Sequence, residues 1–400
     1  MEKYWIWLSL RKMSERQRKQ LAETVSDPQE LFRRVFTAGE LPEDLLETMN
    51  DKDLTQAEKI WEDCKAKDVR VLGFADRDYP PRLRSVEDAP VVLYCLGNVP
   101  RWEEYPLVGV VGTRKLSGYG EQNALRLGKQ IADCGGIVVS GGAAGADALA
   151  MDGALTTGRP VVGVLGTGVD ICYPAENKEL FQKTIHQGCL LSEYPPGTKA
   201  KPWQFPRRNR IISGISHALL VVEAPVESGA LITAQMAKEQ GREVYTVPGG
   251  VGLQNAEGSN RLLQQGATAV LCGWDLMRDF ESLFRTVEKA PGSTEIYQKF
   301  TPVFVAQKPK IPVPEERKKQ QVHKNKVDKL EKSSYSIPVE RSALTPDEEL
   351  ICSYLLQGPR DPEVLLTELN MPSAKALTIL TKLTLTGVVV SHPDGGISLK

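Results

Sequence analysis

The sequence lacks the features that would assign it to several common protein classes. Its seven cysteines are scattered and form no Cys-x-x-Cys pair, which argues against a disulfide framework and indicates a reducing, cytoplasmic protein. None of the four histidines has metal-ligand spacing with another His or Cys, so we predict no metal site. No apolar run approaches the roughly 18 residues of a membrane span, and the N-terminus does not read as a signal peptide.

Motifs of common enzymes and nucleotide-binding proteins are missing as well. The chain contains neither the Gly-x-Ser-x-Gly elbow of the α/β-hydrolases nor the Walker loop that holds triphosphates. Its formal net charge is −1, so the chain as a whole is not basic. Any nucleic-acid site therefore has to be a local basic patch.

What the sequence does contain is a regular alternation of short apolar runs and helical patterns, from about residue 106 to 280. The runs are nearly all apolar, as strands covered on both faces have to be. This alternation predicts an α/β fold with a mostly parallel, doubly wound sheet. We expect its strands in the runs that begin at residues 107, 136, 160, 189, 218, 243 and 268. Ligands of such sheets bind outside the carboxyl ends of the strands, so we place the site there.

We place the α/β domain at residues 69–285, and three further segments make up the rest of the chain. Residues 1–68 carry apolar residues at helical spacing and predict a small helical domain. Residues 286–342 form a basic linker, for which a solvated tether and an electrostatic arm for nucleic acid both stay open. Residues 343–400 predict three helices and a hairpin, a winged helix that binds either DNA or another protein.

Several expected strand ends carry groups that bind anions. Arg114 and Lys115 follow the first strand, where the sequence reads GTRKLS rather than the dinucleotide motif Gly-x-Gly-x-x-Gly. Gly-rich turns that lead into helices follow the second, fifth and sixth strands, and the N–H groups at a helix start attract phosphate. Tight packing and simple helix capping are the alternatives for these turns. The residues concerned are Gly141, Ser228, Gly229, Asn260 and Arg261.

The segment KPWQFPRRNRIISG, residues 201–214, adds aromatic rings to the basic groups. Its rings are Trp203 and Phe205, and its arginines are Arg207, Arg208 and Arg210. A row of anion-binding turns beside stacking rings is typical of a site for single-stranded nucleic acid. Core packing of the rings and surface ion pairs of the arginines are the alternatives. Three carboxylates near strand ends serve either as acid–base groups or, as we favour, to orient the arginines: Asp147, Glu193 and Glu223.

These segments resemble the DNA-processing protein A family (DprA, also called Smf). The resemblance covers about residues 70 to 275 and is most specific in FPRRNRIISG and SGALITA. The N-terminal helices are similar to the sterile-alpha-motif-like (SAM-like) domain of many members, and the C-terminal segment is similar to their winged helix.

The resemblance implies an extended Rossmann-like fold and a protein that binds and protects incoming single-stranded DNA. It further implies loading of the recombinase RecA during natural transformation, a homodimer, and no catalytic turnover; we also predict no cofactor. The phosphate-binding positions of the family correspond to Arg114, Gly141, Lys201, Arg207, Arg208, Arg210, Ser228, Asn260 and Arg261, with Lys115, Lys178 and Lys199 beside them.

The sequence departs from the family pattern at one anchoring position. The motif Ser-Gly-x-Ala-Arg-Gly-x-Asp reads SGGAAGAD here, with Ala144 in place of Arg, which removes one expected contact to DNA. The alternative function is a nucleotide-processing hydrolase, a phosphoribohydrolase of the lysine-decarboxylase-like type, whose Pro-Gly-Gly-x-Gly-Thr-x-x-Glu motif begins like residues 248–256. Leu253 replaces the Thr and Ala256 replaces the catalytic Glu, so we favour DNA binding over catalysis.

Overall fold

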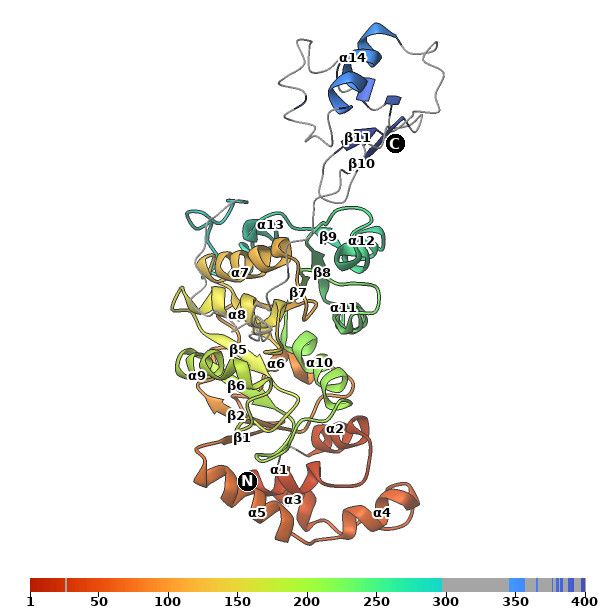
Figure 1. Ribbon diagram of the computed structural model, residues 1–400. Helices are drawn as coiled ribbons and strands as arrows, with labels where there is room; N and C mark the ends of the chain where they lie inside the picture. The colour runs from red at the N-terminus through yellow and green to blue at the C-terminus, as the bar shows by residue number, and fades with distance from the viewer. Residues whose placement is uncertain are drawn as a thin grey trace, which may run out of the picture. The chain divides into compact units, whose positions relative to one another are not determined.

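The computed structural model describes residues 1–25, 27–296 and 345–356, together with a few positions between 365 and 399 (Figure 1). The chain divides into two compact units, Met1–Pro312 and Val313–Lys400. Among the described residues, no helix combines the length and the apolar character that crossing a bilayer requires.

The first unit is built around a nine-stranded sheet with the order β1-β2-β6-β5-β4-β3-β7-β8-β9. All pairs from β6 to β9 are parallel, whereas β1 and β2 pair antiparallel with each other and β2 with β6. The seven predicted strands are confirmed, and the α/β prediction with them. The strands are β1 (Arg70–Gly73), β2 (Val92–Gly97), β3 (Leu107–Val111), β4 (Ile137–Ser140), β5 (Val161–Val164), β6 (Cys189–Ser192), β7 (Ala218–Val221), β8 (Glu243–Thr246) and β9 (Thr268–Ala269).

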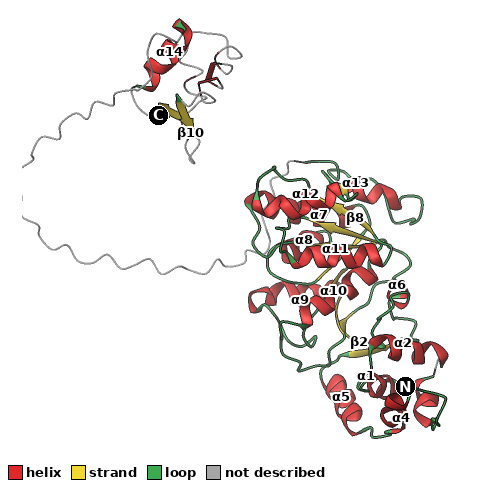
Figure 2. Cartoon of the chain, turned by 90° about the vertical axis from the view of Figure 1, so that its right-hand side faces the viewer, coloured by secondary structure: helices red, strands yellow, loops and turns green. Residues whose placement is uncertain are grey.

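Helices cover both faces of this sheet, which explains why the central strands are apolar throughout. The helices α7 (Gly118–Asp133), α8 (Ala146–Leu155) and α9 (Lys178–Gln187) pack on one face. The other face carries α10 (Gln204–Ile215), α11 (Gly229–Glu239) and α12 (Glu257–Gln264), which are turned toward the viewer in Figure 2. Shorter helices complete the unit: α6 (Pro81–Arg84) and α13 (Gly273–Met277).

The N-terminal helices share their core with the antiparallel edge of the sheet. Trp5, Ile6, Trp7 and Leu8 on the first helix are all buried, and the ring of Trp5 lies so close to Gly73 that a Cβ there would be 2.2 Å from it. The buried residues of this helix and of the sheet form one hydrophobic cluster. The helices are α1 (Glu2–Ser9), α2 (Glu15–Thr24), α3 (Pro28–Arg33), α4 (Glu43–Asn50) and α5 (Thr55–Ala66).

The second unit contains α14 (Pro346–Leu355) and an antiparallel pair, β10 (Val389–Ser391) and β11 (Ile397–Leu399). A capping box begins α14, because Thr345 and Glu348 exchange side-chain and backbone hydrogen bonds there. Most of the linker and most of the two other predicted helices lie outside the described residues. The winged helix therefore stays a prediction.

Candidate nucleic-acid interface

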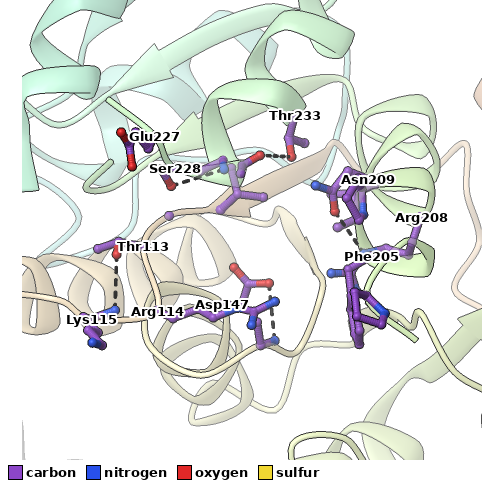
Figure 3. Close-up of a pocket in the computed structure, with 18 of the residues that line it drawn as sticks. Thr113, Arg114, Lys115, Asp147, Phe205, Arg208, Asn209, Glu227, Ser228 and Thr233 are labelled. Atoms are coloured by element: carbon purple, nitrogen blue, oxygen red, sulfur yellow. Dashed lines mark hydrogen bonds between the residues drawn. The ribbon is translucent and has the colours of Figure 1, made fainter. Parts of the chain in front are cut away.

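A cavity of about 660 Å³ lies at the carboxyl ends of β3 and β7 (Figure 3). These two strands are neighbours in the sheet, but the chain leaves β3 toward β4 and leaves β7 toward β8. The chain thus reverses its direction across the sheet at this point, and ligands of α/β sheets bind at such a reversal. The loop after β3 and the start of α11 line the cavity together with α10.

The loop after β3 presents two exposed cations at this cavity. Arg114 and Lys115 both line it, and the Arg114 guanidinium carbon lies 5.8 Å from the centre of the Phe205 ring. The end of this loop is fixed by Glu223, whose side chain accepts hydrogen bonds from the backbone N–H and the hydroxyl of Ser117. Glu223 therefore orients the start of α7 and not an arginine, contrary to the expectation from sequence.

Arg208 lines the same cavity but directs its guanidinium into the protein. Its Nη1 donates to the carbonyl oxygen of Gly141 at 2.7 Å and to that of Val164, and the residue is only 4% exposed. A Cβ at Gly141 would lie 2.3 Å from Nη2, so glycine is required for this approach. Burial lowers the pKa of Arg208 to about 10. Arg208 thus shapes the turn after β4.

Asp147, near the N-terminus of helix α8, also stabilises the loop that follows β4. Its Oδ2 accepts hydrogen bonds from the backbone N–H groups of Gly141 at 3.1 Å and Ala143 at 3.4 Å. Burial raises the pKa of this carboxyl, and the nearby Arg208 opposes that effect. Ala144, which stands where the family has Arg, is half-buried in the same turn.

Arg207 and Arg210 lie on a different cavity, between α10 and α2. The carboxylate of Glu193 holds both of them, with 2.9 Å between Arg207 Nε and Glu193 Oε1. Arg207 also pairs with Glu15 on α2, and Arg210 pairs with Asp88 at 3.2 Å. The prediction that Glu193 orients arginines is confirmed. Both arginines form ion pairs, as the alternative interpretation expected, but Arg210 is buried and does not lie at the surface.

Two aromatic rings line the first cavity. Phe205 lies with its ring centre 5.3 Å from that of Tyr173, which is exposed. Trp203 is 54% exposed and meets Tyr194 edge to face at 6.0 Å, so it is not a core residue. Tyr173 went unnoticed in the sequence, although an aromatic residue before Pro174 in the loop after β5 was a usable signal.

The remaining predicted residues divide between the cavity and the surface around it. Lys201, Ser228 and Gly229 line the cavity, and the Ser228 hydroxyl accepts a hydrogen bond from the Ala230 N–H at the start of α11. Asn260 exchanges two hydrogen bonds of 3.1 Å with the backbone of Gly249 instead. The predicted site residues that do not line this cavity are Gly141, Lys178, Lys199, Trp203, Arg207, Arg210, Asn260 and Arg261. Lining residues that the sequence did not suggest include Thr113, Asn209, Glu227 and Thr233.

The α/β region matches a known family. The sequence model of the family described as DNA recombination-mediator protein A matches residues 70–281. Protein Smf of Synechocystis is 40% identical over 216 residues, which cover 53% of this chain and 54% of that protein. DNA processing protein DprA of Bacillus subtilis is 38% identical over 211 residues, which cover 53% of this chain and 71% of the relative. The chain thus spans about half of the first relative's length and over two thirds of the second's.

A solved structure extends the likeness beyond this region. DNA processing protein A of Streptococcus pneumoniae superposes with a TM-score of 0.60 at 30% identity. The superposition covers 70% of this chain and 98% of that one.

Proposed function

The chain belongs to the DNA recombination-mediator protein A family, and we propose that it binds single-stranded DNA in the cavity at the carboxyl ends of β3 and β7. The observation that carries this proposal is the joint placement of exposed cations and aromatic rings: Arg114 and Lys115 face the same cavity as Phe205 and Tyr173. A positive groove with stacking rings is how proteins hold single strands without reading their sequence.

Charge and hydrogen-bond donors at the cavity suit a phosphate chain. Four basic side chains line it against two carboxylates, those of Asp147 and Glu227. The start of α11 adds the positive end of a helix, with the Ser228 hydroxyl and the exposed backbone of Gly229 at the cavity wall. Phosphate oxygens are acceptors only, and this wall supplies donors.

The rings favour a single strand over a duplex. A base can stack on a protein ring only when it is no longer stacked on the adjacent bases of a duplex. Each base–ring stack stabilises binding by about 1–3 kcal/mol. A duplex would have to melt locally to reach Phe205, which costs free energy. We therefore expect a strand preference rather than a base preference.

The finer features of the proposal extend the family description. We propose that the protein works in the cytoplasm as a homodimer and passes its DNA to RecA. Residues 1–68 serve as a SAM-like domain and residues 343–400 as a winged helix, joined to the α/β domain (69–285) by the basic linker 286–342. We expect no catalytic turnover, because Ala256 stands where the related hydrolases carry their catalytic Glu.

Competition between strands tests this function. A fluorescently labelled single strand is bound to the full chain, and unlabelled single strand or duplex of the same sequence is added while anisotropy is followed. The proposal predicts that the single strand displaces the label at concentrations at least about tenfold below those of the duplex. Equal competition by the duplex would contradict it.

A further inference from the structure

A second cavity, of about 450 Å³, lies between the N-terminal helix α2 and α10. Four arginines and two carboxylates face it, and none of its lining residues belongs to the first cavity. Its lining residues are Met13, Ser14, Glu15, Arg16, Arg18, Asp88, Arg207, Arg210 and Met236.

The start of α2 forms one wall of this cavity. The helix is ten residues long, and its capping residue Ser14 accepts a hydrogen bond from Gln17 N at 3.3 Å while the Gln17 side chain accepts from Ser14 N at 2.8 Å. Ser14, Glu15 and Arg16 all line the cavity. The free N–H groups and the positive dipole end of a helix stabilise an anion at such a place.

The side chain of Arg210 independently indicates an anion-binding site in this cavity. Its side chain is 5% exposed, its Nε pairs with Asp88 and its Nη2 with Glu193, but its Nη1 has no hydrogen-bond partner among the described residues. Nε of Arg18, which lines the same cavity, is also buried without a partner. A buried donor without an acceptor destabilises the folded chain, and a phosphate oxygen would accept its hydrogen bond.

Of the four arginines that line the cavity, Arg16 is the one that forms no ion pair with a lining carboxylate, whereas Arg18 pairs with Glu15. Glu15 and Glu193 hold Arg207, and Arg210 is fixed by its own carboxylates. Among the described residues Arg16 pairs with Glu87, and both side chains of this pair are about two-thirds exposed (66% and 68%). Such an exposed pair contributes little to stability, so a phosphate can replace Glu87 as the partner of Arg16.

We propose that this α2–α10 cavity is a second phosphate site, which binds the backbone of the same DNA strand that occupies the first cavity. The proposal rests on the function proposed above. Arg207 and Arg208 are consecutive residues of α10, yet Arg207 lines the second cavity and Arg208 the first. A strand that leaves the first cavity across α10 therefore meets Arg16 and the start of α2 next.

Oligonucleotide length separates the two cavities in an experiment. Binding of oligothymidylates from about 4 to about 20 nucleotides is measured by anisotropy across a salt series for the wild-type chain and for Arg16→Ala. For the long strands we expect Arg16→Ala to reduce affinity about fivefold and to flatten the slope of log K against log salt by about 0.7, the value for one phosphate on a single strand. For the shortest strands, which fill only the first cavity, we expect no change.

The matched control is Arg34→Ala. Arg34 is an exposed arginine at the end of α3, it forms an ion pair with Glu40, and it lines neither cavity. Equal effects of Arg16→Ala and Arg34→Ala at every length would overturn the second site, and so would a loss by Arg16→Ala that is the same for short and long strands. Failure of the function itself looks different: the wild-type chain would then bind no single strand of any length.

The carboxylate of Glu15 provides a second, opposite test. Glu15 lines the cavity and repels phosphate, so Glu15→Gln is expected to raise affinity for long strands several-fold. Its control is Glu23→Gln, which removes the same charge from the same helix at a residue that pairs with Lys19 outside the cavity. An equal gain from both variants would mean that only the net charge of α2 acts, and would contradict a defined site.

Discussion

Arg208 Nη1 lies 2.7 Å from the carbonyl oxygen of Gly141, a residue 67 positions earlier in the chain. This hydrogen bond joins α10 to the turn after β4, and the nearby Asp147 holds the N–H of the same glycine. The turn that faces the first cavity is therefore fixed from both sides. Arg208 acts on the site through this turn, whereas the exposed Arg114 is free to contact a ligand directly.

Arg208→Ala should lower the free energy of unfolding by about 2–4 kcal/mol. The substitution takes a donor from two buried carbonyl oxygens and removes the cation that most strongly opposes the effect of burial on Asp147. Urea unfolding followed by tryptophan fluorescence measures the loss. Arg114→Ala is the control, since an exposed arginine should change stability by less than about 0.5 kcal/mol. Equal stability of the two variants would show that the Arg208 contacts contribute nothing.

Phe205→Ala should weaken single-strand binding by about 1–3 kcal/mol without changing its salt dependence, because a stacked ring neutralises no phosphate. Affinity measured at several salt concentrations gives both quantities. Phe205→Tyr keeps the ring and should retain most of the affinity. A change in salt slope for Phe205→Ala would indicate that the variant had moved Arg114, which lies over this ring.

His217 should make the protein less stable in acid. Its Nδ1 accepts a hydrogen bond from Leu107 N at 3.0 Å, and burial, with Arg82 and Arg242 nearby, lowers its pKa to about 3. The folded chain thus keeps the ring neutral below pH 6.5, where the unfolded chain binds a proton. Stability from this residue is complete above about pH 6.5 and falls as the pH drops toward 3, by up to about 1.4 kcal/mol per pH unit.

Urea unfolding at a series of pH values measures this dependence. His217→Gln has no titrating group at this position, so its stability should fall less steeply than that of the wild-type chain between pH 6.5 and 4. Parallel curves for the two proteins would show that His217 is protonated to the same extent in the folded and unfolded chains.

Removal of the residues after about 300 should leave single-strand affinity within about twofold of the full chain's, because every residue that lines either cavity precedes this point. The shortened chain keeps the continuous core of the first unit and should fold. Anisotropy with a short oligonucleotide measures the affinity. A loss of more than about tenfold would assign a large part of binding to the linker or the C-terminal segment.

The sequence predicted strands β3 to β9 and the end of the sheet at which the cavity lies, because both follow from local apolar runs and from a general rule of topology. It assigned residues 1–68 to a helical domain without singling out helix α1, because Trp5–Leu8 are all buried and leave no regular polar face there. The sequence also could not show which arginine of the segment RRNR lines which cavity. Consecutive helical residues point about 100° apart, so the neighbours Arg207 and Arg208 line different cavities.

The partners of these arginines were beyond sequence reasoning for a related reason. Glu15 lies 192 positions from Arg207, and only the packing of α2 beside α10 brings them together. Asn260 and Arg261 looked like ligands from their place in a Gly-rich segment, but folding commits Asn260 to Gly249 and pairs Arg261 with Glu257.

The most direct test of the account is the affinity of Arg114→Ala for a single-stranded oligonucleotide across a salt series, beside Arg101→Ala. Arg101 is a strongly exposed arginine paired with Glu104 and lines neither cavity. We expect Arg114→Ala to lose about tenfold in affinity and about 0.7 in salt slope, while Arg101→Ala matches the wild-type chain. If Arg114→Ala binds as tightly as Arg101→Ala, with the same slope, DNA does not occupy the cavity at the ends of β3 and β7.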